Sequence, residues 1–148
     1  MSYPVMLCVA GKKCLVAGGG PVAERKIRSL INAGADVHVV SPALAASLAG
    51  PAGSKRGFKY SKRIFESCDI KGAFLVIAAT DDKKVNSRIC LLASKKGVLC
   101  NSVNTRVNTS FMNMATKKIN GLTVAVSSRG KDIKKAKKLL AVFEKAKA

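Results

Sequence analysis

Short apolar runs alternate with amphipathic stretches along the first hundred residues of the chain. Residues 13–17, 37–40, 73–78 and 98–100 are predominantly apolar, and residues 58–60 form a shorter run of the same kind. Strands that a parallel sheet buries on both faces have this pattern. The runs therefore predict the strands of a parallel sheet.

Two of the stretches between these runs have the spacing of helices. Pro21 opens the first and Gly34 follows its end, which is the usual punctuation of a helix of about 13 residues. Residues 82–95 form the second, with inward positions predicted at Val85, Ile89, Leu92 and Ala93. Strands that alternate with helices form βαβ units. The fold class predicted is therefore α/β, a doubly wound parallel sheet with covering helices.

The pattern changes after residue 101. Residues 110–115 and 122–126 are predicted to be strands, joined by a turn at Asn120-Gly121. Residues 131–147 are predicted to form a basic helix. One face of that helix carries Ile133, Ala136, Leu139, Leu140 and Phe143.

The chain is strongly basic for its length of 148 residues. Its 27 lysine and arginine residues against 8 aspartate and glutamate residues give a net charge of +19. The excess rises from +3 in residues 1–50 (5 basic, 2 acidic) to +9 in residues 101–148 (11 basic, 2 acidic). Such charge predicts an anionic partner: a nucleic acid, a membrane surface or a polyanionic metabolite. Two tyrosines, no tryptophan and no base-reading motif make nucleic acid an unfavoured partner. No apolar run is long enough to span a membrane, and no membrane partner is expected.

The cysteines and the single histidine do not predict a reactive site. Five cysteines without a C-x-x-C pair predict free thiols in a reduced, cytoplasmic protein, and Cys14, Cys90 and Cys100, which lie in apolar runs, are expected to pack as small apolar groups. No signal peptide is expected from the first residues. No metal site is expected, because the potential ligands are not spaced in pairs. His38 lies in an apolar strand, so we expect a buried, hydrogen-bonded role for it rather than catalysis.

A glycine turn follows the first predicted strand. Residues 18–23 fit G-x-G-x-x-A, in which Gly18 allows a tight exit from the strand and Gly20 lets a pyrophosphate approach the backbone. The helix that follows supplies amide donors at its N-terminus. The motif predicts dinucleotide binding, although a tight turn that binds no nucleotide has the same pattern. Ser41 lies at the end of the next strand, where many NAD-binding proteins have an acidic residue that binds the ribose 2′-hydroxyl. A serine can also bind a ribose but does not repel a 2′-phosphate, so the motif does not decide between NAD and NADP.

A second group of polar residues follows the apolar run at 73–78. Thr80 is predicted at the carboxyl end of that strand, the edge where open α/β sheets bind ligands, and we expect it to contact the cofactor. Asp81 or Asp82 is expected to cap the next helix. Together these features predict a Rossmann-like dinucleotide-binding domain over residues 1–104, with NAD as the cofactor that the resemblance described next implies, and a short β/α extension over residues 105–148.

Several of these segments together resemble one family. They are YP at 3–4, GKK at 11–13, GGGPVA at 18–23, ADVHVVSP at 35–42, AFLVIAATDD at 73–82 and VN at 85–86. The combination is similar to the dehydrogenase domain of siroheme synthase, a precorrin-2 dehydrogenase that in some members is also a sirohydrochlorin ferrochelatase. The resemblance covers residues 3–130. It implies NAD-dependent oxidation of precorrin-2 to sirohydrochlorin, by a homodimer built partly through the extension.

The resemblance also implies a set of site residues, with one departure. The family pattern Asn-x-Val-Asp is Asn101-Ser102-Val103-Asn104 here, so Asn104 stands at the position of the catalytic aspartate. An amide is neither a carboxylate base nor a charged iron ligand, which counts against ferrochelatase activity; hydride transfer depends more on positioning. The expected cofactor contacts are Gly18, Gly20, Pro21, Val22, Ser41, Thr80, Asn101 and Val103. Ser128 and Arg129 lie in a turn that resembles the family's turn before the final helix, and we expect them to line the substrate cleft. Arg106 is expected from its place at the sheet edge to face an acidic substrate, although an exposed loop arginine has the same pattern.

A second class of function stays open. A non-catalytic NAD-binding regulatory module would carry the same glycine turn. The lysines of residues 131–147 would then contact a partner, whereas in an enzyme they could form an ordinary solvated helix face.

Overall fold

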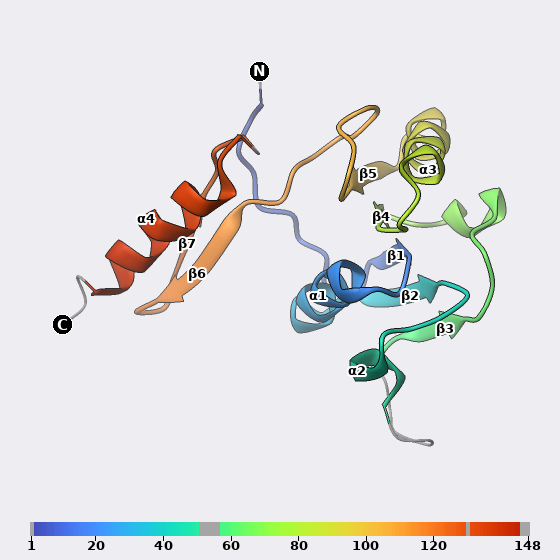
Figure 1. The fold of residues 1–148 in the computed structure, drawn as a ribbon, viewed down its shortest axis with the longest axis horizontal. Helices are drawn as coiled ribbons and strands as arrows, with labels where there is room; N and C mark the ends of the chain where they lie inside the picture. The colour runs from blue at the N-terminus through green and yellow to red at the C-terminus, as the bar shows by residue number, and fades with distance from the viewer. Residues whose placement is uncertain (1, 51–56, 130, 146–148) are drawn as a thin grey trace. The chain divides into compact units, whose positions relative to one another are not determined.

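A computed structural model describes residues 2–50, 57–129 and 131–145 (Figure 1). The chain forms two compact units, residues 1–110 and residues 111–148, and each is described by itself. In the described part of the chain, no helix is both long and apolar enough to cross a membrane.

The first unit is built on a five-stranded parallel sheet. Its strands are β1 (Lys13–Ala17), β2 (Asp36–Val40), β3 (Lys59–Ser61), β4 (Leu75–Ala78) and β5 (Leu99–Ser102). Their order in the sheet is β3-β2-β1-β4-β5, and every neighbouring pair is parallel. The predicted doubly wound α/β fold is confirmed, with each strand within two residues of its predicted start.

Two helices cover the sheet, α1 (Pro21–Asn32) and α3 (Lys83–Lys95), and they lie on opposite sides of the strands in Figure 1. The chain leaves β1 toward one edge of the sheet and β4 toward the other, and right-handed crossovers in opposite directions place their helices on opposite faces. Two single-turn elements, α2 (Ala46–Ala49) and η1 (Ser67–Ile70), were not predicted because one turn is too short to show a periodic pattern.

The sheet interior is apolar. All residues of β4 and the last four of β1 are buried. The inward face of α3 consists of Asn86, Ile89, Cys90 and Ala93. The prediction for Val85 is therefore wrong: its side chain is 37% exposed, and the next residue, the polar Asn86, is fully buried in its place. The side-chain amide of Asn86 forms hydrogen bonds with Thr80 and Asn104.

The second unit is a hairpin, β6 (Ala115–Ile119) and β7 (Leu122–Val126), packed on the helix α4 (Ile133–Lys145). The predicted turn at Asn120-Gly121 is present, with both residues at positive φ. The predicted strand at 110–115 is wrong. A two-residue turn pairs the residues that flank it, here Ile119 with Leu122, so the first strand must end at the turn.

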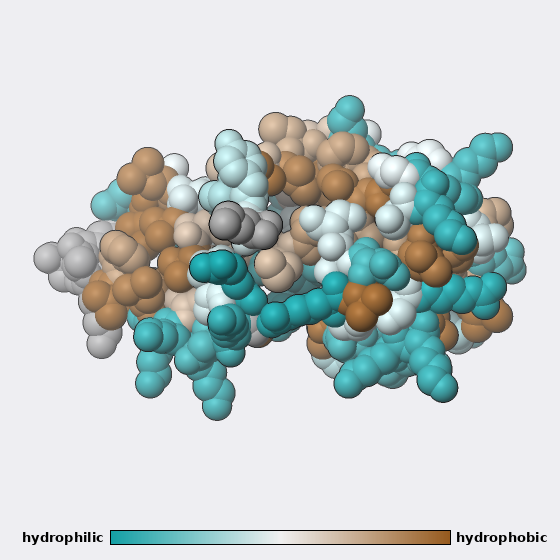
Figure 2. Space-filling view, turned by 90° about the horizontal axis from the view of Figure 1, so that it is seen from above, coloured by the Kyte–Doolittle hydropathy of each residue, from teal (hydrophilic) through white to brown (hydrophobic). Residues whose placement is uncertain are grey.

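The apolar face of α4 is only partly covered. Ala136 and Leu140 are each 5% exposed, whereas the other apolar residues of that face remain exposed to solvent. Figure 2 shows apolar side chains beside hydrophilic ones in the region that carries α4. The large apolar residues of α4 that are exposed among its described side chains are Ile133, Leu139, Val142 and Phe143.

Candidate dinucleotide site

A cleft of about 1020 Å³ opens at the carboxyl ends of β1, β2 and β4 in the first unit. The glycine turn, the loop after β2 and the residues after β4 form its inner side. The direction of strand order reverses between β1 and β4, and open α/β sheets bind ligands at such a point. The cleft therefore lies where the fold class places a cofactor.

The three glycines of the turn are small for different reasons. Gly18 has a φ of +122°, and a Cβ there would collide with the carbonyl oxygen of Ala79. A Cβ on Gly19, which the sequence motif left unassigned, would collide with the carbonyl oxygen of Ala43. A Cβ on Gly20 would meet nothing within 4 Å. The fold thus requires Gly18 and Gly19, whereas Gly20 leaves free space at the mouth of the turn.

The N-terminus of α1 faces that free space. Gly20 is the N-cap, Pro21 is the first helical residue, and no side chain caps the helix. The first N–H groups of a helix lack intrahelical acceptors, so they can donate to an anion. The carboxylate of Glu24 in this turn accepts hydrogen bonds from Ser47 and Arg28, which lower its pKa. The negative charge of Glu24 is therefore paired with other residues of the chain.

Ser41 lies at the end of β2 and is 7% exposed. Its hydroxyl donates to the carbonyl oxygen of Ala43 at 2.7 Å. The hydroxyl proton is therefore committed to the chain, and the oxygen can offer a ligand only its lone pairs. A ribose hydroxyl can donate to such an oxygen, whereas a phosphate oxygen finds no donor in it.

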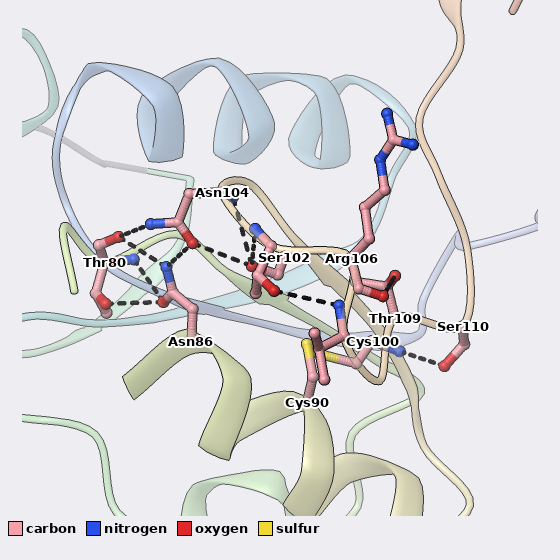
Figure 3. Close-up of a disulfide and its surroundings, with 11 residues drawn as sticks. Thr80, Asn86, Cys90, Cys100, Ser102, Asn104, Arg106, Thr109 and Ser110 are labelled. Atoms are coloured by element: carbon pink, nitrogen blue, oxygen red, sulfur yellow. Dashed lines mark hydrogen bonds between the residues drawn. A yellow bond between two sulfur atoms is a disulfide. The ribbon is translucent and has the colours of Figure 1, made fainter. Parts of the chain in front are cut away.

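A hydrogen-bonded network joins the ends of β4 and β5 (Figure 3). The Thr80 N–H and hydroxyl donate to Asn86 Oδ1 at 3.0 and 2.7 Å, and Asn86 Nδ2 donates to the Thr80 carbonyl at 2.8 Å. The same Nδ2 donates to Asn104 Oδ1 at 2.9 Å. Ser102 Oγ donates to that oxygen at 3.3 Å. Asp82 caps α3 by accepting from the N–H groups of Lys84 and Val85, as expected.

The structure brings some of the expected cofactor contacts together. Gly18, Gly20, Ser41 and Thr80 all line the cleft. The exposed residues Pro21 and Val22 adjoin it as the start of α1. Asn101 is buried in β5, and the Val103 N–H donates to the Ala78 carbonyl, so neither lines the cleft. Whether each of these residues contacts a cofactor stays a prediction.

The expected substrate residues lie in both units. Arg106 is an exposed residue of the loop after β5, and its side chain extends away from Cys90 in Figure 3. Ser128 and Arg129 belong to the second unit, in the loop before α4. There Ser128 Oγ accepts from the Asp132 N–H, and Arg129 has a φ of +52°. Their contact with a substrate likewise stays a prediction.

Other residues of the cleft were missed by the sequence analysis. Leu44, Phe65 and Leu92 contribute apolar surface, and Arg88 is the one cation among the described residues that line the cleft. Phe65 and Leu44 follow strands in loops without periodic pattern, so no sequence rule located them. Arg88 and Leu92 are one helical turn apart on α3, and that spacing was the available clue.

The cysteine prediction is wrong for two residues. Cys90 of α3 and Cys100 of β5 form a disulfide, with a Cα–Cα distance of 5.4 Å (Figure 3). Cys8, Cys14 and Cys68 are free. Burial raises the pKa of Cys14 to about 11, so its thiol stays protonated at neutral pH. The pairing follows from the packing of α3 on β5, which the sequence spacing of the cysteines does not reveal.

His38 has the hydrogen-bonded role expected of it, although the ring is half-buried. Its Nε2 lies 2.9 Å from Ser61 Oγ, across the β2–β3 pair. Desolvation by burial, and next the charge of Lys13, lower its pKa. Next to it, Arg63 makes a two-pronged hydrogen bond with Asp69, which holds the pKa of that carboxyl below its usual range.

Fold and site together define a class of protein. A doubly wound sheet, a glycine turn with free space at Gly20 and uncapped amides at α1 fit a dinucleotide pyrophosphate. The chain is thus a dinucleotide-binding α/β protein by architecture. Within the described residues, no three His, Cys, Asp or Glu side chains converge in a way that could hold a metal ion.

Comparison with known proteins identifies the family. A family model described as "Putative NAD(P)-binding" matches residues 5–115. The siroheme synthase of Nitrosococcus oceani is 39% identical over 131 residues, 88% of this chain and 28% of that protein. The siroheme synthase of Nitrosomonas eutropha is 35% identical over 128 residues, 86% of this chain and 27% of that protein. The chain belongs to the NAD(P)-binding family that forms the N-terminal domain of siroheme synthases.

A solved structure agrees with this assignment. That of SirC, precorrin-2 dehydrogenase, has a TM-score of 0.83 and 25% sequence identity, over 98% of this chain and 71% of that one. The chain spans about a quarter of the length of the two siroheme synthases.

Proposed function

We propose that the chain is an NAD-dependent dehydrogenase that oxidises precorrin-2 to sirohydrochlorin. The observation that carries the proposal is the cleft at the point where the strand order reverses, between β1 and β4. Gly20 lines this cleft and leaves free space there that no other part of the fold fills. The similarity of the chain to siroheme synthases and to SirC supports the choice of precorrin-2 as substrate. NAD, when bound, would supply a nicotinamide ring as the hydride acceptor, and oxidation of the macrocycle would also release a proton.

The residues of the chain would bind and orient rather than donate protons. The amides at the start of α1 would bind the pyrophosphate, and Ser41 would accept from a ribose hydroxyl. NAD is therefore the preferred cofactor in this proposal. Thr80 and Asn104 lie at the ends of β4 and β5, held by a network without an ionisable group. A neutral network can position the substrate for hydride transfer without taking up its proton.

We do not extend the proposal to iron insertion. Asn104 carries no charge, and its amide oxygen already accepts from Asn86 and Ser102. A step that needs a carboxylate to take protons from a pyrrole has no such group at this position.

The experiment mixes the protein with precorrin-2 and NAD and follows sirohydrochlorin absorbance together with NADH. Appearance of both products in equal amounts is expected. A blank reaction under conditions in which an active precorrin-2 dehydrogenase turns over would contradict the proposal. NADP in place of NAD serves as the cofactor control, and slower turnover is expected with it.

The neutral site favours one other function, a regulatory module that binds NAD without turnover. In that case the protein would bind NAD as tightly as an active dehydrogenase does, and precorrin-2 would not be oxidised. The lysines of α4 would then contact an anionic partner, and Lys134, Lys135, Lys137 and Lys138 are all exposed. Calorimetric NAD binding combined with the blank reaction would separate the two functions.

We also propose that the protein is a cytoplasmic homodimer, with residues 105–148 serving dimerisation and the substrate cleft. The exposed apolar residues of α4 support a contact between copies, because isolated apolar groups of this size gain from burial.

A further inference from the structure

The side chain of Asn86 is fully buried, yet it lies on a helix face that otherwise packs apolar residues. An unpaired amide in that position would cost stability, so its hydrogen bonds must repay the burial. They reach both residues at the ends of β4 and β5, Thr80 and Asn104 (Figure 3).

The orientation of the Asn86 amide is fixed from one side. The Thr80 N–H can only donate, and it lies 3.0 Å from Asn86 Oδ1. The Thr80 carbonyl can only accept, and it lies 2.8 Å from Asn86 Nδ2. A flipped amide would oppose donor to donor and acceptor to acceptor. Backbone groups therefore dictate which end of the amide is the donor.

That orientation leaves one N–H of Asn86 directed at position 104. It donates to Asn104 Oδ1 at 2.9 Å, and Ser102 Oγ donates to the same oxygen at 3.3 Å. By contrast, Asn104 Nδ2 has only a long contact of 3.4 Å with the Thr80 carbonyl. The surroundings of residue 104 thus supply two donors and one weak acceptor.

We propose that Asn86 is the positioning residue of the site: it locks Thr80 and presents a donor that selects a hydrogen-bond acceptor at position 104. The inference deepens the proposed function and rests on it for its catalytic meaning. An amide oxygen satisfies the donor here, and a carboxylate oxygen would satisfy it as well. The site is therefore built to accept Asn104→Asp without rearrangement.

The first test uses side-chain amide exchange, measured by NMR on the full chain. Both Asn86 side-chain protons are expected to be protected from solvent. In Asn104→Ala, which leaves the core intact, the proton directed at residue 104 should lose its protection, and the proton bound to the Thr80 carbonyl should keep it. Unchanged exchange of both protons would overturn the proposal.

The second test places a carboxylate at position 104 and follows its titration by carbon NMR. In Asn104→Asp the two donors should lower the pKa of the new carboxyl. In the double variant Asn104→Asp with Asn86→Asp, two carboxyls meet and the pKa should rise. The matched control combines Asn104→Asp with Ser94→Asp, which adds the same charge at an exposed residue of α3. Equal titration in all three backgrounds would overturn the proposal.

The kinetic test separates this inference from the proposed function. Asn86→Asp keeps the acceptor for the Thr80 N–H and loses the donors to the Thr80 carbonyl and to Asn104, so kcat should fall about 100-fold with little change in KM for NAD. The same change in an Asn104→Ala background should add little. Additive losses would contradict the positioning role. If the wild type has no dehydrogenase activity, the proposed function fails, and the two NMR tests still decide the role of Asn86.

Discussion

Gly18 and Gly20 are glycines for different physical reasons. Gly18 has a φ of +122° and no room for a Cβ beside Ala79, whereas Gly20 has ordinary extended backbone and an open neighbourhood. The first glycine therefore serves the fold, and the second is free to serve a ligand.

We expect Gly20→Ala to leave the free energy of unfolding nearly unchanged and to weaken NAD binding about tenfold, because its methyl group would occupy ligand space. Gly18→Ala should instead destabilise the fold by about 2 kcal/mol or more through strain and collision. Urea unfolding and calorimetric titration with NAD measure the two effects. An NAD affinity of Gly20→Ala equal to that of the wild type would show that the pyrophosphate lies elsewhere.

Ser41 makes a prediction about cofactor choice. Its hydroxyl proton is bound to the Ala43 carbonyl, so it accepts from a ribose but gives nothing to a 2′-phosphate. We expect NAD to bind more tightly than NADP, and Ser41→Ala to weaken NAD about fivefold, for one lost hydrogen bond of about 1 kcal/mol. Dissociation constants for both cofactors check this. Tighter binding of NADP to the wild type would contradict it.

The residue scale also shows where sequence reasoning stops. The glycine turn, Thr80 and the cap at Asp82 follow from local rules of strand ends and helix starts, and they were predicted. For Asn86 the sequence predicts no role, because its hydrogen-bond partners are 6 and 18 residues away in the chain. Only packing brings such groups together.

At the scale of elements, the parallel strands were the most predictable part. These strands are buried on both faces, so each appears in the sequence as a continuous apolar run that can be recognised without a periodic pattern. The hairpin shows the opposite case. Apolar residues at 111–114 suggested a strand, but the turn geometry at Asn120 places β6 directly beside the turn. The geometry of the turn outweighed the apolar pattern.

The Cys90–Cys100 disulfide ties α3 to β5, and this link predicts a stability effect. The cross-linked residues are 10 apart, and closing such a loop stabilises a fold by about 2–3 kcal/mol. Reductant should lower the free energy of unfolding by that amount, and Cys90→Ala/Cys100→Ala should be insensitive to reductant. Cys68→Ala is the control, since Cys68 is free and exposed. Because Cys14 is buried, the protein is alkylated in denaturant before reduction; mass spectrometry should then find three of the five cysteines alkylated, and five would contradict the link.

His38 predicts how the β2–β3 pair responds to pH. Its folded-state pKa lies below the unfolded value, so the unfolded chain binds a proton more readily as pH falls through about 6.5. Stability present above that pH is then lost on acidification. His38 is the only histidine of the chain, so His38→Asn should remove most of the decline between pH 7.5 and 5.5. Urea unfolding at both values measures it, and a wild type equally stable at both would contradict the linkage.

At the scale of the whole molecule, the cleft does not explain the basic charge. Among its described lining residues are three carboxylates, Glu66, Asp81 and Asp82, and one cation, Arg88. A dinucleotide pyrophosphate would thus be bound by backbone amides and the helix dipole. Lysine is densest instead in the second unit, where residues 111–148 hold 9 of the 20 lysines of the chain.

The second unit also carries the prediction of oligomeric state. Leu139 and Phe143 of α4 are 46% and 48% exposed, beside the buried Ala136 and Leu140. A second copy could cover them, so we expect a mass in sedimentation of twice 15.6 kDa. Full burial of an exposed Leu or Phe is worth about 1.5–3 kcal/mol, and these two are already half-buried, so a partner copy would gain about 1 kcal/mol from each. Leu139→Gln with Phe143→Gln should therefore shift the protein toward monomer.

The control for this prediction changes the opposite side of the same helix. Lys134→Gln and Lys138→Gln remove charge from exposed positions and leave the apolar face intact, so these variants should keep the mass of the wild type. Turnover measured on the monomeric variant then decides what the contact does. If residues 105–148 complete the substrate cleft through dimerisation, turnover falls while NAD binding in the first unit persists. A wild type that sediments as a monomer at all concentrations would contradict the homodimer, and the exposed apolar residues would then need another partner.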